Sequence, residues 1–169
     1  MTKRSIYLDH GATTPVHPQV LESMLPYWTE HYGNPSSSHS FGRKAESALR
    51  SARETISDLL GAAPGEIVFT ANGSASDNLA IRGVVKSKLA QDKGTHIIIS
   101  SIEHSAVKNT AVQLADLNEC ELTILPVDQN GQIRLPDLEA AIRPETSLIS
   151  IMAANNEIGT LQPIEKIGQ

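Results

Sequence analysis

Apolar side chains recur at intervals of three or four residues from Ala45 to Leu60, and a glycine follows directly. This spacing predicts an amphipathic helix that ends at Gly61. Further along the chain, short apolar runs of strand length alternate with segments of helical period, and a turn is expected at residues 128–131. The predicted strands are Ile67–Thr70, His96–Ser100, Leu122–Val127 and Ser147–Met152, and the predicted helices are Asp77–Lys88, Ala106–Leu117, Leu135–Ile142 and one that begins near Pro163. Alternating strands and helices are typical of an α/β fold with a mostly parallel sheet.

The composition narrows the class of protein. A chain of 169 residues that is 40% hydrophobic can bury one sizeable core, and its net charge of −5 provides no basic surface for nucleic acid. It has neither a run of about 18 apolar residues that could cross a membrane nor an apolar segment at its amino end. We therefore expect a cytoplasmic protein with small-molecule or protein partners. The single cysteine, Cys120, precedes a predicted strand and is interpreted as structural rather than reactive.

In parallel α/β sheets, binding residues gather in the loops that follow the carboxyl ends of the strands. The first such loop lies within Thr70–Asn78, which reads TANGSASDN. Its small residues lead into a helix whose first free amides, from Gly73 to Ala75, could hold an anion such as phosphate. Alternatively, Ser74, Ser76 or Asp77 merely caps the helix.

Two further loops carry polar side chains after predicted strands. His104, in the sequence SIEHSAV, could stack on an aromatic ligand or transfer a proton, or it could simply cap a helix at the surface. In NNEIG, a side-chain amide of Asn155 or Asn156 could bond a ring substituent, although paired asparagines are also common in turns. The six histidines lack the close spacing of metal ligands, so we expect no metal site.

Five motifs follow one another along the chain: YLDHGATTPV, YGNPSSSHSFGRKA, EIVFTANGSASDNLAIRG, EHSAV and NNEIGTLQPI. Together they resemble the cysteine desulfurases, which are pyridoxal-phosphate enzymes of the class V aminotransferase family. The resemblance implies an incomplete fold type I large domain with three αβα layers. It assigns residues 1–15 to the small-domain region and residues 16–169 to the cofactor-binding domain, and it implies a homodimer.

The resemblance also gives roles to the three loops. Gly73 and Ser74 match the positions that bind the cofactor phosphate through backbone amides and a hydroxyl. His104 matches the catalytic histidine that stacks on the pyridine ring and transfers protons. Asn156 matches the asparagine whose amide approaches the ring hydroxyl. These roles suit the residues, since a helix N-terminus binds phosphate and a flat heteroaromatic ring suits a flat partner.

The phosphate loop departs from the family pattern at three positions. The family commonly has glycine, threonine and glutamate where this chain has Asn72, Ser74 and Ala75. Ser74 retains a hydroxyl and Asn72 tolerates a left-handed backbone, so phosphate binding is expected to survive. Loss of the glutamate is expected to change how the site is tuned.

The implied parent reaction converts L-cysteine to L-alanine and passes the sulfur, as an enzyme persulfide, to an acceptor such as an iron–sulfur scaffold. The family's cofactor-bearing lysine and persulfide cysteine would lie beyond Gln169. This chain alone is therefore expected to be inactive and to bind pyridoxal phosphate weakly or not at all, and Ile67–Thr70 would pair with a strand outside it. A selenocysteine lyase-like protein is one alternative. Another is a non-catalytic chain that binds a full-length desulfurase or a scaffold through the family's dimer surface.

Overall fold

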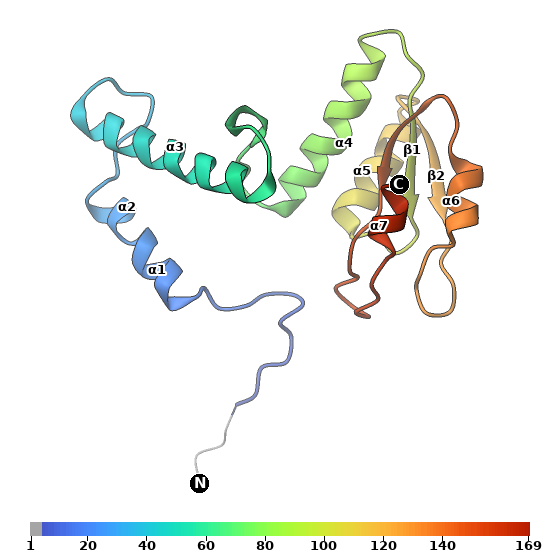
Figure 1. Ribbon diagram of the computed structural model, residues 1–169, viewed down its shortest axis with the longest axis horizontal. Coiled ribbons are helices and arrows are strands. Elements are labelled where there is room, and N and C mark those ends of the chain that lie inside the picture. The colour runs from blue at the N-terminus through green and yellow to red at the C-terminus, as the bar shows by residue number, and fades with distance from the viewer. Residues whose placement is uncertain (1–4) are drawn as a thin grey trace. The chain divides into compact units, whose positions relative to one another are not determined.

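The computed structural model describes residues 5–169, which are drawn in colour in Figure 1. Residues 1–4, part of the segment 1–15 that the resemblance assigns to the small-domain region, lie outside the described residues. The contacts divide the chain into two compact units, one ending at Phe69 and one running from Thr70 to Gln169. We refer to them as the amino-terminal unit and the carboxyl-terminal unit.

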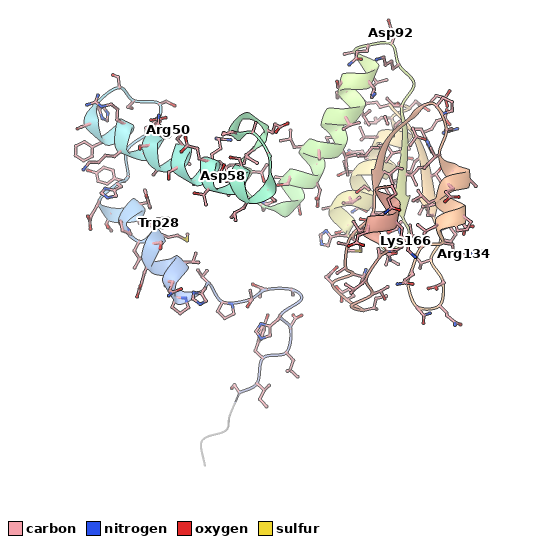
Figure 2. All side chains as sticks on the ribbon, in the orientation of Figure 1. Trp28, Arg50, Asp58, Asp92, Arg134 and Lys166 are labelled. Carbon is pink, nitrogen blue, oxygen red and sulfur yellow. The ribbon has the colours of Figure 1, made fainter. Side chains whose placement is uncertain are left out.

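The amino-terminal unit is helical. Its helices are α1 (Pro18–Met24), α2 (Pro26–Thr29), α3 (Ser40–Leu60) and the short 3-10 helix η1 (Pro64–Glu66). The imidazole of His39 caps α3 by accepting from Gly42 N at 3.3 Å, and α3 ends as predicted at Gly61, whose φ of 64° favours glycine. Many apolar side chains of this unit are exposed, Trp28 at 75% among them (Figure 2). The helices of this unit are therefore defined by local features such as caps more than by packing in a shared core.

The strand predicted at Ile67–Thr70 is wrong, because this segment belongs to no sheet among the described residues. A strand exists only where its amides and carbonyls pair with a neighbouring strand. Here the Ile67 carbonyl accepts instead from the guanidinium of Arg53, which also lies over the Phe69 ring at 4.8 Å from its centroid. Val68 is 65% exposed. An apolar run in the sequence indicates that the backbone tends to be extended, but it does not show that a neighbouring strand is present to pair with it.

The carboxyl-terminal unit contains a three-stranded parallel sheet with the order β2-β1-β3. Figure 1 labels β1 and β2. Its strands are β1 (His96–Ser100), β2 (Glu121–Leu125) and β3 (Thr146–Ser150), and its helices are α4 (Gly73–Leu89), α5 (Ser105–Asp116), α6 (Leu135–Ala141) and α7 (Ile164–Ile167). The elements predicted after residue 70 are all present, although α4 begins at Gly73 rather than at Asp77. The turn expected at residues 128–131 is also present, and Gly131 has a φ of 79°.

Side chains of β1 alternate between the two faces of the sheet. Ile97 and Ile99 pack with α4 and α5 on one face, whereas Ile98 packs with α6 and α7 on the other. All five residues of β1 are buried, as expected for the central strand of a parallel sheet covered on both faces. The arrangement confirms the predicted α/β fold with three αβα layers.

The amino end of β1 carries a buried histidine that contacts both flanking strands. His96 Nε2 lies 2.8 Å from Thr123 Oγ1 on β2, and His96 Nδ1 lies 2.8 Å from Thr146 Oγ1 on β3. Burial, together with the nearby positive charge of Arg143, lowers the pKa of His96 from its ordinary value. His96 therefore ties the three strands together in its neutral form.

Two features bear on the expectations from composition. Cys120 is buried just before β2, and burial together with the negative charge of Glu119 raises the pKa of its thiol. A thiol that stays protonated is a poor nucleophile, which agrees with a structural role. Across residues 5–169, no helix combines the length and the apolar character needed to cross a bilayer.

Candidate functional site

The first turn of α4 is set by Asn72, which caps the helix. Its side-chain Oδ1 accepts from Ala75 N at 2.9 Å, and its carbonyl accepts from Ser76 N at 3.1 Å. The φ of Asn72 is −168°, an extended conformation, so the left-handed backbone that asparagine tolerates is not used here. Asparagine is useful here as a cap, a position at which it is among the preferred residues. The predicted caps Ser74, Ser76 and Asp77 lie inside the helix instead.

This cap leaves the amides of Gly73 and Ser74 without an acceptor among the described residues. Nothing lies within 4 Å of the position that a Cβ would occupy at Gly73, so the backbone there faces open space. The Ser74 side chain is exposed beside it. Two such amides and a hydroxyl at a helix N-terminus favour an anion.

His104 caps α5 at the end of the loop that follows β1. Its Nδ1 accepts from Ala106 N at 3.1 Å, so the neutral ring carries its proton on Nε2. The side chain is exposed. The capping role considered for this histidine is therefore present, and it fixes the orientation of a ring that solvent and ligands can still reach.

A buried carboxylate joins the loop after β1 to the end of β3. Glu103 Oε1 accepts from Ser100 Oγ at 2.6 Å and from Met152 N at 2.8 Å. Sequence reasoning missed Glu103, because a charged residue in a polar loop is ordinarily exposed. Its one signal in the sequence is its position just after an apolar strand.

The two asparagines of NNEIG have different surroundings. Asn155 is buried, and its Nδ2 donates to Ile102 O at 3.0 Å. Its Oδ1 accepts from Glu157 N at 2.9 Å and from Ile158 N at 3.0 Å, which closes the turn. Asn156 is exposed, and its Nδ2 donates to Glu157 Oε1 at 3.0 Å. The first asparagine thus holds the loop, and the second presents its amide at the surface.

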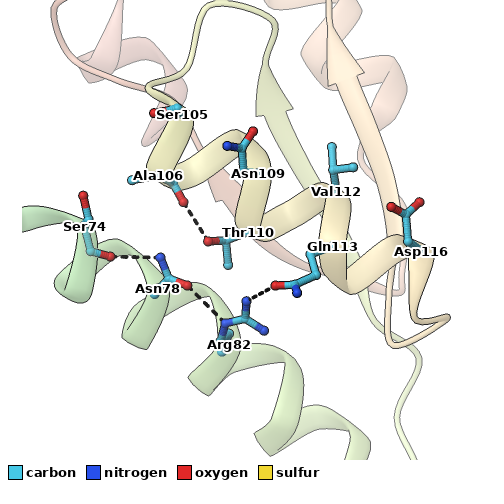
Figure 3. Close-up of a pocket in the computed structure, with 10 residues that line it drawn as sticks. All are labelled: Ser74, Asn78, Arg82, Ser105, Ala106, Asn109, Thr110, Val112, Gln113 and Asp116. Atoms are coloured by element: carbon cyan, nitrogen blue, oxygen red, sulfur yellow. Dashed lines mark hydrogen bonds between the residues drawn. The ribbon is translucent and has the colours of Figure 1, made fainter.

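The loops that carry His104 and Asn156 follow the carboxyl ends of β1 and β3, and the start of α4 lies beside the start of α5. Ser74 of α4 and Ser105 and Ala106 of α5 line a shared groove of about 620 Å³ (Figure 3). His104 directly precedes Ser105 in the chain. The two buried side chains described above hold the loop that contains Asn156 against the loop that contains His104.

The residues present fit a phosphorylated aromatic ring such as pyridoxal phosphate. The amides of Gly73 and Ser74 suit a phosphate, the exposed ring of His104 suits a flat heterocycle, and the amide of Asn156 can bond a ring hydroxyl. Within residues 5–169, no cluster of three or more His, Cys, Asp or Glu side chains could hold a metal ion.

The sequence matches known proteins over nearly its whole length. The family model described as aminotransferase class-V matches residues 6–169. This chain is 50% identical to the cysteine desulfurase IscS of Methanosarcina thermophila over 166 residues, which are 98% of the chain. Over the same share of the chain it is 48% identical to the mitochondrial cysteine desulfurase of Arthroderma benhamiae. The chain spans only 40% and 33%, respectively, of the lengths of these two relatives.

The fold matches as well. The solved structure of "SspA in complex with cysteine" superimposes with a TM-score of 0.89 at 48% identity, over 97% of this chain and 46% of the other. Sequence and structure agree over the same residues. The chain therefore belongs to the class-V aminotransferase family and is homologous to the cysteine desulfurases within it.

Proposed function

We propose that this chain is the amino-terminal part of a pyridoxal-phosphate-dependent cysteine desulfurase. The whole protein would convert L-cysteine to L-alanine and transfer the sulfur, as an enzyme persulfide, to an acceptor protein. In this proposal residues 1–15 belong to the small-domain region and residues 16–169 to the cofactor-binding domain. The named relatives, and the similar protein solved in complex with cysteine, support it.

One observation carries the proposal: two loops with complementary binding groups follow the carboxyl ends of strands, and the start of α4 lies beside one of them. Gly73 and Ser74 offer amides, His104 offers an exposed ring, and Asn156 offers an exposed amide. Binding groups at this end of a parallel sheet are common in α/β proteins. The buried bonds of Glu103 and Asn155 limit how far the loops of His104 and Asn156 can move apart.

In this proposal the start of α4 holds the cofactor phosphate. The amides of Gly73 and Ser74 donate to phosphate oxygens, and the Ser74 hydroxyl adds a third donor. Because Asn72 already satisfies the amide of Ala75, the helix directs its remaining amides to the ligand without further rearrangement.

His104 and Asn156 would hold the ring. The cap on Nδ1 keeps the proton of the neutral His104 ring on Nε2, which would donate a hydrogen bond to the ligand. A proton given up by His104 would have to come from the doubly protonated ring, because the neutral ring is not an acid near neutral pH. The Asn156 amide would donate to the ring hydroxyl and fix the rotation of the ring in its plane. Bound pyridoxal phosphate supplies an electron sink for bonds at the α-carbon of an amino acid.

An NMR titration of the isotopically labelled chain tests this site without relying on activity. The aldehyde of pyridoxal phosphate condenses with exposed lysines, so the probe is pyridoxine 5′-phosphate, which keeps the ring and the phosphate but lacks the aldehyde. We expect weak binding that shifts the amide signals of Gly73 and Ser74 and the ring signals of His104. Ser74→Ala should weaken binding about fivefold, or roughly 1 kcal/mol.

Ser105→Ala is the matched control, because it removes a hydroxyl from the same groove but on the other helix. It should leave the affinity unchanged. The site assignment fails if the probe leaves the amides of Gly73 and Ser74 unshifted, or if Ser105→Ala weakens binding as much as Ser74→Ala does.

The partners and location of the whole protein belong to the same proposal. We infer a homodimer with L-cysteine as substrate and an iron–sulfur scaffold or another sulfur acceptor as protein partner. The proposed location is the cytoplasm, with the mitochondrion as the alternative suggested by the Arthroderma relative's name. A selenocysteine lyase-like activity is a further alternative. Sulfide and selenide release by the whole protein from cysteine and selenocysteine would distinguish the two substrates.

A second candidate function is a non-catalytic chain that binds a full-length desulfurase or a scaffold. It is favoured by exposed apolar side chains in the amino-terminal unit, including Trp28 and Leu59, because such surfaces often mark protein contacts. Light scattering on mixtures of this chain with a full-length desulfurase tests it. A stable mixed complex supports this function, and chains that elute separately contradict it.

A further inference from the structure

Three polar residues form a stripe along the face of α4 that meets α5 (Figure 3). Ser74, Asn78 and Arg82 follow one another at intervals of four residues and therefore share one side of the helix. Asn78 Nδ2 donates to Ser74 O at 3.0 Å, and Arg82 Nε donates to Asn78 Oδ1 at 3.1 Å. The stripe leads from the middle of α4 to the turn that carries the proposed phosphate amides.

Arg82 extends this stripe to the neighbouring helix. Its Nη2 donates to Gln113 Oε1 on α5, so one half-buried guanidinium bonds the side-chain amides of two helices (Figure 3). No carboxylate of residues 5–169 forms an ion pair with Arg82. An arginine bound by two neutral amides orients its partners rather than neutralising a charge, because its planar donors point in fixed directions.

We propose that Arg82 is a positioning residue that fixes how α4 lies along α5. This inference rests on the proposed function, because α4 begins with the phosphate-binding Gly73 and Ser74 and α5 begins just after His104. The bridge from Arg82 to Gln113 sets the separation between the phosphate position and the ring position.

The packing beneath the bridge explains why a polar contact is needed. Ile81 and Val85 of α4 lie in one apolar cluster with Val107, Ala111 and Leu114 of α5. Apolar contacts are not directional, so this cluster holds the helices together but tolerates small shifts along or about their axes. Hydrogen bonds have narrow angular limits and therefore select one register.

A ligand that carries a phosphate and a ring on one rigid skeleton needs both positions at the correct separation. A ligand with only one of these groups does not. Loss of Arg82 should therefore weaken the binding of a ligand that carries both the phosphate and the ring. It should leave the binding of a ligand with only one of these groups nearly unchanged.

The test compares three probes on the full chain by NMR titration: pyridoxine 5′-phosphate, pyridoxine and inorganic phosphate. Arg82→Gln should weaken the binding of pyridoxine 5′-phosphate about tenfold. The reason is that a shift of α4 along α5 would misplace either the phosphate contact or the ring contact. Affinities for pyridoxine and for phosphate should stay within about twofold. Arg82→Lys, which keeps a donor for one of the two amides, should recover part of the loss.

Lys86→Gln is the matched control, because Lys86 lies one turn further along α4 and pairs with Glu119 at 2.6 Å, beyond the end of α5. It should leave the affinities for all three probes unchanged. An equal loss for the three probes in Arg82→Gln would mean general destabilisation and would overturn the inference, as would no loss for any of them. If the unaltered chain binds pyridoxine 5′-phosphate no better than inorganic phosphate, the phosphate and ring positions are not coupled in this chain and the inference fails, whereas the proposed function of the whole protein does not.

Discussion

The two units of this chain place their apolar residues very differently. In the carboxyl-terminal unit, β1 is buried from His96 to Ser100 and covered by helices on both faces. In the described part of the amino-terminal unit, Ala45 is the only apolar side chain that is buried, although this unit contains the long helix α3. Both units nevertheless form capped, regular helices. The comparison shows that local signals suffice for a helix, whereas a core requires partner segments that bury its apolar face.

The largest expected difference between the units lies in hydrogen exchange. Amides of Ile97 to Ser100 form the centre of the sheet, whereas those of Ile67 to Phe69 join no sheet among the described residues. We expect protection of the strand amides to exceed that of the second group by a factor of about a thousand or more, because core amides exchange only through global opening. Mass spectrometry or NMR would measure it. Uniform protection across both groups would show that the amino-terminal unit has a core of its own.

A smaller difference is expected from truncations of apolar side chains. Ile98→Ala removes a fully buried side chain from β1 and should lower the free energy of unfolding by about 2–5 kcal/mol. Leu59→Ala in α3, where the side chain is 81% exposed, should change it by less than about 0.5 kcal/mol. Denaturant unfolding measures both, and Ile98→Val should lie between them. Equal losses at the two positions would contradict the assignment of the core to the carboxyl-terminal unit.

The smallest effect concerns pH and arises from His96 in the carboxyl-terminal unit. His96 has a lowered pKa in the folded chain, so the unfolded chain binds its proton more readily. Its contribution to stability is complete above the ordinary pKa of 6.5 and is lost as the pH falls toward the folded value. Arg143 favours this loss, and Glu121 and Glu145 oppose it. The free energy of unfolding should therefore decrease on acidification by at most about 1.4 kcal/mol per pH unit.

His96→Gln supplies the control for this pH effect, because glutamine does not titrate. The variant should be less stable at neutral pH, and its stability should change less between pH values of about 7 and 5 than that of the unaltered chain. The same pH dependence in both proteins would assign the titration to another group.

The sequence predicts most of the carboxyl-terminal unit because its signals are local or simply periodic. The apolar run at His96–Ser100 and the helical periods on either side give the alternation, and the alternation gives the parallel sheet. Two details differ for physical reasons. The strand at Ile67–Thr70 lacks a neighbour to pair with among the described residues, and α4 starts at Gly73 because the side chain of Asn72 accepts from Ala75 N and so caps the helix before Asp77.

Within the candidate site, the sequence predicted exposed binding residues and a possible turn role for Asn155, but it did not predict Glu103 or the bonds that join the loops. Gly73, Ser74 and His104 are predicted from motif and position. Glu103 and Asn155 act through contacts with segments about 50 residues away, such as Met152 N and Ile102 O. No local pattern encodes a contact over that separation, so only the folded structure reveals it.

The capping bond of His104, beside its proposed contact with the cofactor ring, changes how any mutational survey of this site must be interpreted. His104 Nδ1 completes the start of α5, so His104→Ala would remove an imidazole and also loosen the helix that follows. If His104→Ala were inactive, the result would not distinguish the loss of the ring from the loss of the helix cap. His104→Asn retains an acceptor suited to the cap while deleting the aromatic, protonatable ring. Of the two substitutions, only asparagine can report on the chemistry of the ring itself.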